Sequence, residues 1–186
     1  IGIYVSPSGH HKHSFYLVDA ADIFGLRRTD KNIVANVVRY HRRVPPRETH
    51  VPYMSLAKSD RAIVSKLASI LRVADALDTA HQQKIRSFTL ERSEDAYALW
   101  VPKGIGDISL ERESLRRKGD MFADVFGAPT VRLLQVDSIR NPLLGPLAIE
   151  DAGHAGRIVR EGFNDIKAHQ LAVMAGIQAA LTRLLE

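Results

Sequence analysis

The spacing of apolar residues predicts three helices within residues 1–82. The first follows Gly9, with a helical pattern at spacings of three and four: His10, His13, Leu17 and Ala20. The second begins near Thr29, a suitable N-cap, and ends before Pro45, because proline cannot continue a helix. The third occupies residues 61–80. We expect the apolar faces of all three helices to share one interior.

Between residues 84 and 136 the pattern becomes that of a small α/β module. The stretches IRSFTLER, AYALWVP and GDISL are typical of strands. An amphipathic helix follows in ERESLRRKGDMFADVF, closed by Gly127 as a C-cap, and TVRLLQV is expected to form a final strand. The predicted order is therefore β-β-β-α-β.

The last part of the chain has a different character. DSIRNPLLGP contains Asn-Pro and Gly-Pro breakers and indicates a linker. Beyond it lies an apolar stripe at helical spacing, formed by Ile158, Val159, Phe163, Ile166, Val173, Ile177, Leu181 and Leu184. The expected fold is mainly α: a helical domain over 1–82, an α/β domain over 83–136, and a linker and helical tail over 137–186.

Composition is that of a soluble globular protein. Of the 186 residues 45% are hydrophobic and 25% charged, and none is cysteine, which excludes disulfides and cysteine-ligated zinc. No apolar run approaches the roughly 18 residues of a membrane span, and the first residues do not resemble a signal peptide. We expect a cytoplasmic protein without membrane contact.

Positive charge is concentrated in the predicted helical domain. Residues 1–82 contain 12 Lys and Arg against 7 Asp and Glu, whereas the remainder contains 14 of each. Six of the eight histidines also lie in the first 82 residues. A basic surface attracts anions such as phosphates, although a solvated basic face would have the same composition.

Three metal-capable side chains fall on the predicted inner faces of the three helices. His13 lies four residues before Leu17, and His41 and Asp75 hold corresponding positions on the second and third helices. Burying such groups is costly unless they are paired or bind a cation, and imidazoles with a carboxylate bind divalent metals. The alternative is a hydrogen-bonded core in which His41 is satisfied by Asp75 or by a backbone carbonyl.

Basic residues on the same predicted helices are candidates for phosphate binding, because guanidinium groups pair bidentately with phosphate. They are Lys12, Arg39, Arg42, Arg43 and Arg72. His10 and His11 are interpreted as exposed residues at a helix start. Glycine-rich nucleotide loops and a serine nucleophile motif are both missing from the sequence, so we assign no catalytic residue.

Several of these stretches together resemble a known family. IGIYVSPSGHHKHSFYLV, VVRYHRRVPP, ILRVADALDTAHQQKI and LERESLRRKGDMFADVFG are similar, in order and spacing, to the C-terminal region of the exopolyphosphatase / guanosine pentaphosphate phosphohydrolase family. The resemblance covers about residues 1–134. It implies an HD-type helical domain followed by a small α/β domain.

The resemblance also implies where the chemistry would lie. In the HD superfamily a late aspartate, matching Asp75, acts with a His-Asp doublet that we expect to precede Ile1, and His13 and His41 match further ligand positions. A divalent metal such as Mg or Mn is the implied cofactor. Phosphohydrolase activity in the family resides in actin-like N-terminal domains, so this segment would line a basic channel for polyphosphate and support a homodimer.

The tail resembles a second family. IRNPL and GFNDIKAHQLAVMAGIQAALTRLLE are similar to the C-terminal region of type VI secretion proteins that carry a forkhead-associated domain, over about residues 138–186. Three functions follow from the sequence: an accessory domain that binds polyphosphate or another phosphate anion, a metal-dependent HD-type phosphohydrolase, or a helical scaffold of a secretion system. Nucleic acid is not an expected partner.

Overall fold

The computed structural model describes residues 2–42 and 44–136, so the predicted tail and Arg43 lie outside it. The N-terminal half is helical. Its elements are η1 (Gly2–Tyr4), α1 (His10–Ala20), α2 (Arg28–Arg39), α3 (Val51–Met54) and α4 (Lys58–Leu77). The three predicted helices are therefore confirmed, and α3 is a short turn within the loop that connects the second and third.

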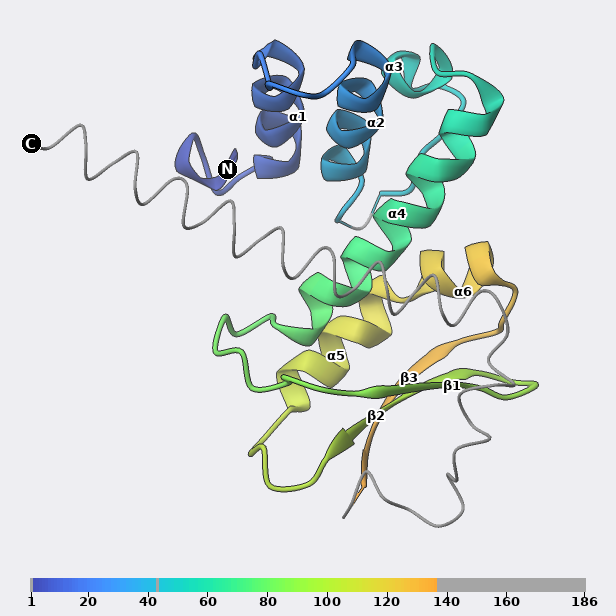
Figure 1. The fold of residues 1–186 in the computed structure, drawn as a ribbon. Helices are drawn as coiled ribbons and strands as arrows, with labels where there is room; N and C mark the ends of the chain where they lie inside the picture. The colour runs from blue at the N-terminus through green and yellow to red at the C-terminus, as the bar shows by residue number, and fades with distance from the viewer. Residues whose placement is uncertain (1, 43, 137–186) are drawn as a thin grey trace, which may run out of the picture.

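Helices α1 and α2 stand side by side, and α2 also packs against α4 (Figure 1). Phe15 and Val18 of α1 pack on Ala35 of α2. Below them, a second cluster joins Val37 of α2 to Val64 of α4. These contacts form one continuous helical layer.

The inner face of α1 differs from the predicted one. Its buried residues are Ser14, Phe15 and Val18, whereas Leu17 is 40% exposed. Because successive helical residues are rotated by about 100°, moving the buried stripe by one position turns His13 away from the centre of the face. The observed stripe places the aromatic Phe15 and the β-branched Val18 against α2.

The segment η1 is held tightly against α1. The Gly2 amide donates to Ser14 Oγ at 3.0 Å, and a Cβ on Gly2 would lie 2.0 Å from the carbonyl oxygen of His10. A glycine is therefore required at this contact.

The second half is a three-stranded sheet covered by helices. It contains β1 (Thr89–Arg92), β2 (Tyr97–Pro102), α5 (Ser109–Lys118), α6 (Asp120–Phe126) and β3 (Val131–Val136). Strand β2 lies in the centre, antiparallel to β1 and parallel to β3. Its side chains alternate, with Tyr97, Leu99 and Val101 buried, as expected for a strand with one covered face.

One predicted strand is wrong. GDISL does not form a strand: Ser109 begins α5, with its amide and hydroxyl both donating to the Asp107 carboxylate. These hydrogen bonds hold the start of α5 two residues before Glu111, where the helix was expected to begin. The helix is also divided at Gly119 into α5 and α6, so the observed order is β-β-α-α-β. The Gly127 C-cap is confirmed by its left-handed conformation, with φ at 70°.

Helix α4 connects the two halves (Figure 1). Its first half contributes Val64 to the helical core, and its second half contributes Ile70 and Val73 to the core beneath the sheet. Met121 of α6 reaches back into the helical core. Both cores therefore share α4, and the domain boundary expected after residue 82 stays a prediction.

Among residues 2–42 and 44–136, no helix combines the length and the apolar character that crossing a membrane requires.

Candidate functional site

Two histidines meet where α1 begins and α2 has just ended. His10 is the first residue of α1. The sequence had placed His41 on the second helix, but it lies two residues beyond the end of α2. Their Nε2 atoms are 3.0 Å apart and their rings are stacked, with centroids 5.1 Å apart. His10 Nδ1 faces the Pro7 carbonyl oxygen at 3.2 Å, and His41 Nδ1 faces that of Val38 at 2.5 Å.

His11 completes a group of three imidazoles. Its ring lies edge-on to both neighbours, at centroid distances of 6.1 Å from His10 and 6.5 Å from His41. The interpretation of His10 and His11 as exposed is wrong, since both are half-buried. The sequence carried a signal for His11, which lies four residues before the buried Phe15 and so on the same side of α1.

Electrostatics at the cluster are strongly positive. The pKa of His11 is lowered to about 4, first by burial and then by the positive charges of His41, Arg42, His10 and Lys12. Burial also lowers the pKa of His41, against the Val38 carbonyl and Asp75, which raise it. The depressed pKa of His11 therefore reflects burial first, and to a smaller extent the basic groups on α1 and after the end of α2.

Asp75 approaches the same cluster from α4. Its carboxylate forms an ion pair with Lys118 at the end of α5, and both groups act electrostatically on His41. Lys118 was not predicted for the site, because it is distant in sequence from Asp75 and from the histidines. His41 thus has the backbone-carbonyl partner that the hydrogen-bonded alternative predicted.

The predicted metal ligands do not form a three-ligand group in this structure. Within the part of the chain that the structure describes, no three His, Cys, Asp or Glu side chains are arranged to hold a metal ion. Asp75 is engaged by Lys118, and the buried stripe of α1 passes His13 by. The imidazole that His41 does meet is that of His10.

The predicted phosphate-binding residues divide into two groups. Lys12 and Arg42 are exposed and both act on His11. Arg39 is half-buried, with its guanidinium carbon 5.2 Å from the centre of the Phe15 ring. Arg72, by contrast, is fully buried: Nε donates to the Tyr40 carbonyl oxygen at 2.8 Å, which fixes it inside the protein. In this position Arg72 is a structural residue that cannot reach an anion at the surface.

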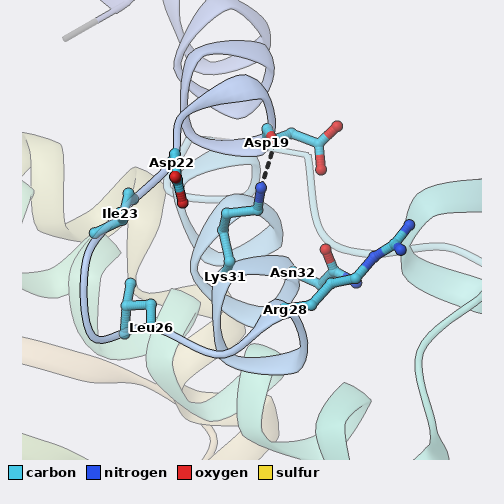
Figure 2. A pocket seen from close by; sticks show the side chains of 7 residues that line it. All are labelled: Asp19, Asp22, Ile23, Leu26, Arg28, Lys31 and Asn32. Atoms are coloured by element: carbon cyan, nitrogen blue, oxygen red, sulfur yellow. Dashed lines mark hydrogen bonds between the residues drawn. The ribbon is translucent and has the colours of Figure 1, made fainter.

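An open pocket of about 400 Å³ lies at the other end of α1 (Figure 2). It is lined by residues from the end of α1, the following loop and the start of α2: Asp19, Asp22, Ile23, Leu26, Arg28, Lys31 and Asn32. Lys31 Nζ donates to the carbonyl oxygens of Asp19 and Ala21, at 2.8 and 3.2 Å. The Lys31 ammonium group therefore provides hydrogen-bond donors to carbonyl oxygens at the C-terminal end of α1. We interpret the pocket as the space around this contact between α1 and α2, not as a ligand site.

Comparison with protein families agrees with both resemblances seen in the sequence. A model described as "Ppx/GppA phosphatase, domain III" matches residues 1–118, which include the histidine cluster and its basic neighbours. A second, "C-terminal domain of Type VI secretion system FHA protein", matches residues 151–186, outside the described residues. Since the first match covers more than half of the sequence and ends with α5, the chain belongs to the Ppx/GppA phosphatase family.

Proposed function

We propose that this chain acts as an accessory domain that binds polyphosphate, or a related phosphate polyanion, and supports hydrolysis carried out by catalytic domains elsewhere in a Ppx/GppA-type protein. Polyphosphate carries a negative charge on every repeat, so a track of lysine and arginine can bind it along its length. Family membership supports a role in phosphate metabolism, and the choice of ligand rests on the surface described above.

The observation that carries the proposal is the positive potential at the start of α1. Lys12 on α1 and Arg42 in the loop after α2 both lower the pKa of His11. The first turn of α1 contains no acidic residue and its N-cap, Gly9, provides no side-chain cap. A helix N-terminus already favours an anion, and here the surrounding cations strengthen that preference.

Binding of a polyphosphate of defined length to the full chain tests the proposal. We expect the association constant to fall steeply as salt rises, because a bound polyanion releases its counterions. Replacing Lys12 and Arg42 with alanine should weaken binding at low salt and make the slope of log K against log salt shallower by about one for each lost phosphate contact.

A matched charge control comes from α4. Lys58 and Lys66 are exposed on the same protein, and replacing both with alanine removes the same net charge. Along the helix they lie about 25 and 13 Å from Asp75, at a rise of about 1.5 Å per residue. If the control pair weakened binding as much as Lys12 and Arg42 do, binding would be a general effect of charge. Binding that is absent, or unchanged by salt, would contradict the proposal.

Two other roles remain predictions. A metal-dependent HD-type hydrolase would require ligands in addition to those brought together here. A scaffold role of the tail concerns residues outside the described structure. The expected homodimer also remains a prediction, and light scattering coupled to size-exclusion chromatography would measure it directly.

A further inference from the structure

The hydrogen-bond directions at the His10–His41 contact require something positive between the two rings. A carbonyl oxygen can accept a hydrogen bond but cannot donate one. Each Nδ1 faces a carbonyl oxygen, of Pro7 for His10 and of Val38 for His41. Each ring therefore carries its hydrogen on Nδ1. A neutral imidazole has one N–H, so both Nε2 atoms present lone pairs.

Those two lone pairs face each other across 3.0 Å. Two acceptors at this distance repel unless a shared proton or a metal cation lies between them. The separation suits two ligands of one metal ion: two nitrogens at about 2.0–2.1 Å from a metal, in neighbouring tetrahedral or octahedral positions, are about 2.8–3.4 Å apart. The Nδ1 contacts to carbonyl oxygens are also the outer-shell pattern that fixes a metal-binding histidine.

We propose that His10 and His41 form a two-histidine site for a divalent first-row transition metal, with Nε2 of each ring as the ligand. This ligand set differs from the His13, His41 and Asp75 set expected from the sequence. Two imidazoles favour zinc, nickel, copper or cobalt over magnesium or calcium, which prefer oxygen ligands. The remaining coordination positions would be filled by water or by oxygens of a bound anion.

The charges around the site set its strength. Asp75 favours a positive charge at His41, while Lys118 and His10 oppose it. Lys12 and Arg42 lie close enough to act on the neighbouring His11. These cations weaken metal binding, so we expect a site of moderate affinity. The proposal does not depend on polyphosphate binding, and the metal can be tested without any phosphate present.

The first experiment is calorimetric titration of the full, untagged chain with Ni²⁺ after treatment with a chelator, and with Mg²⁺ as the hard-ion comparison. We expect one equivalent of Ni²⁺ to bind, with little or no binding of Mg²⁺. His10→Gln and His41→Gln should each weaken Ni²⁺ binding at least about tenfold, since loss of even an outer-shell partner costs about 10–100-fold. His13→Gln, three residues further along α1, is the matched control and should bind normally.

A second measurement keeps the test independent of how well the variants fold. Long-range ¹H–¹⁵N spectra of the wild-type imidazoles should show N–H on Nδ1 of both rings and a change in both Nε2 signals when Zn²⁺ is added. Failure of the wild type to bind either metal would overturn the proposal. So would Ni²⁺ binding that is unaffected in His10→Gln, or a proton held at Nε2 that Zn²⁺ does not displace.

Discussion

At the residue scale, Arg72 is a basic side chain that is buried and has a structural role. Its side chain is completely enclosed, and it connects three elements: Nε donates to Tyr40 at the end of α2, and Nη1 contacts Asp120 at the start of α6 at 3.3 Å. Burial lowers the pKa of Arg72, and the Asp120 carboxylate partly offsets this. Arg72 therefore stabilises the junction between the helical layer and the α/β half.

Replacing Arg72 tests this role. Arg72→Ala should lower the free energy of unfolding by about 3 kcal/mol, because it leaves the Tyr40 carbonyl without its partner and opens a cavity. Arg72→Met should cost less, since an apolar side chain of similar length fills the space. Urea denaturation measures both. Lys66→Ala, an exposed change on the same helix, should stay within about 0.5 kcal/mol of wild type, and an equal loss there would contradict the assignment.

His11 predicts a dependence of stability on pH. Its pKa falls from 6.5 to about 4 on folding, mainly through burial. Between about pH 4 and 6.5, His11 is therefore protonated in the unfolded chain but neutral in the folded chain. Stability is fully present above pH 6.5 and decreases as the pH falls toward 4.

The measurement compares wild type with His11→Gln by thermal unfolding at several pH values, with a chelator present. Carboxylates titrate in the same range, so the informative quantity is the difference between the two proteins. The variant should lose less stability than wild type between pH 6.5 and 4. The exposed His81→Gln serves as the control; parallel pH profiles for wild type and His11→Gln would show that His11 has no such effect.

At the element scale, η1 depends on one close backbone approach. Gly2→Ala should lower the free energy of unfolding by about 1–3 kcal/mol, because the new Cβ would lie 2.0 Å from the His10 carbonyl oxygen and 2.5 Å from the Ser14 amide nitrogen, both backbone atoms. Hydrogen exchange of the Ser14 amide should accelerate as η1 separates from α1. Ser8→Ala, an exposed change in the turn between η1 and α1, should alter neither quantity.

Secondary structure was largely predictable where periodicity was strong. The start of α1, the long α4 and the strands β1, β2 and β3 all follow from local patterns. The N-cap of α2 was predicted two residues late: it is Arg27, and Thr29 lies inside the helix. The strand expected in GDISL does not form, because the Asp107 carboxylate accepts two hydrogen bonds from Ser109 at the start of α5. An alternating run of only five residues is too weak a signal to distinguish a strand from such a helix start.

The candidate site was less predictable, because it depends on rotation and on long-range pairing. A shift of one position in the buried stripe of α1 exchanged His13 for His10 and His11 as neighbours of His41. The pairing of Asp75 with Lys118 joins residues 43 positions apart. Local spacing contains no information about such a contact, and Arg72 likewise gave no sign in the sequence that it would be buried.

At the scale of the whole molecule, the two halves should unfold together. Val64 and Ile70 lie on the same helix but belong to different cores, so neither core can be lost without exposing part of α4. Trp100, on β2, is the single tryptophan and reports on the α/β half. Unfolding followed by Trp100 fluorescence should coincide with unfolding followed by far-ultraviolet circular dichroism.

Val64→Ala extends this test. The mutation lies in the helical core, whereas the fluorescence of Trp100 monitors unfolding of the sheet. Loss of the buried side chain should destabilise the protein by about 1–3 kcal/mol and shift the Trp100 transition by the same amount as the helical signal. The exposed Val51→Ala is the control. A variant in which the helical signal moves and the Trp100 transition does not would show that the halves are independent.

The sharing of α4 also affects the protein while it is being synthesised. Met121 belongs to the same cluster as Ala68, yet it leaves the ribosome 53 residues later. At a synthesis rate of about 5–20 residues per second, Met121 is added roughly 3–10 s after Ala68, and until then the apolar side of α4 is not fully covered. Until then the helical half has an incomplete core, and a nascent chain paused between α4 and α6 exposes that surface to chaperones.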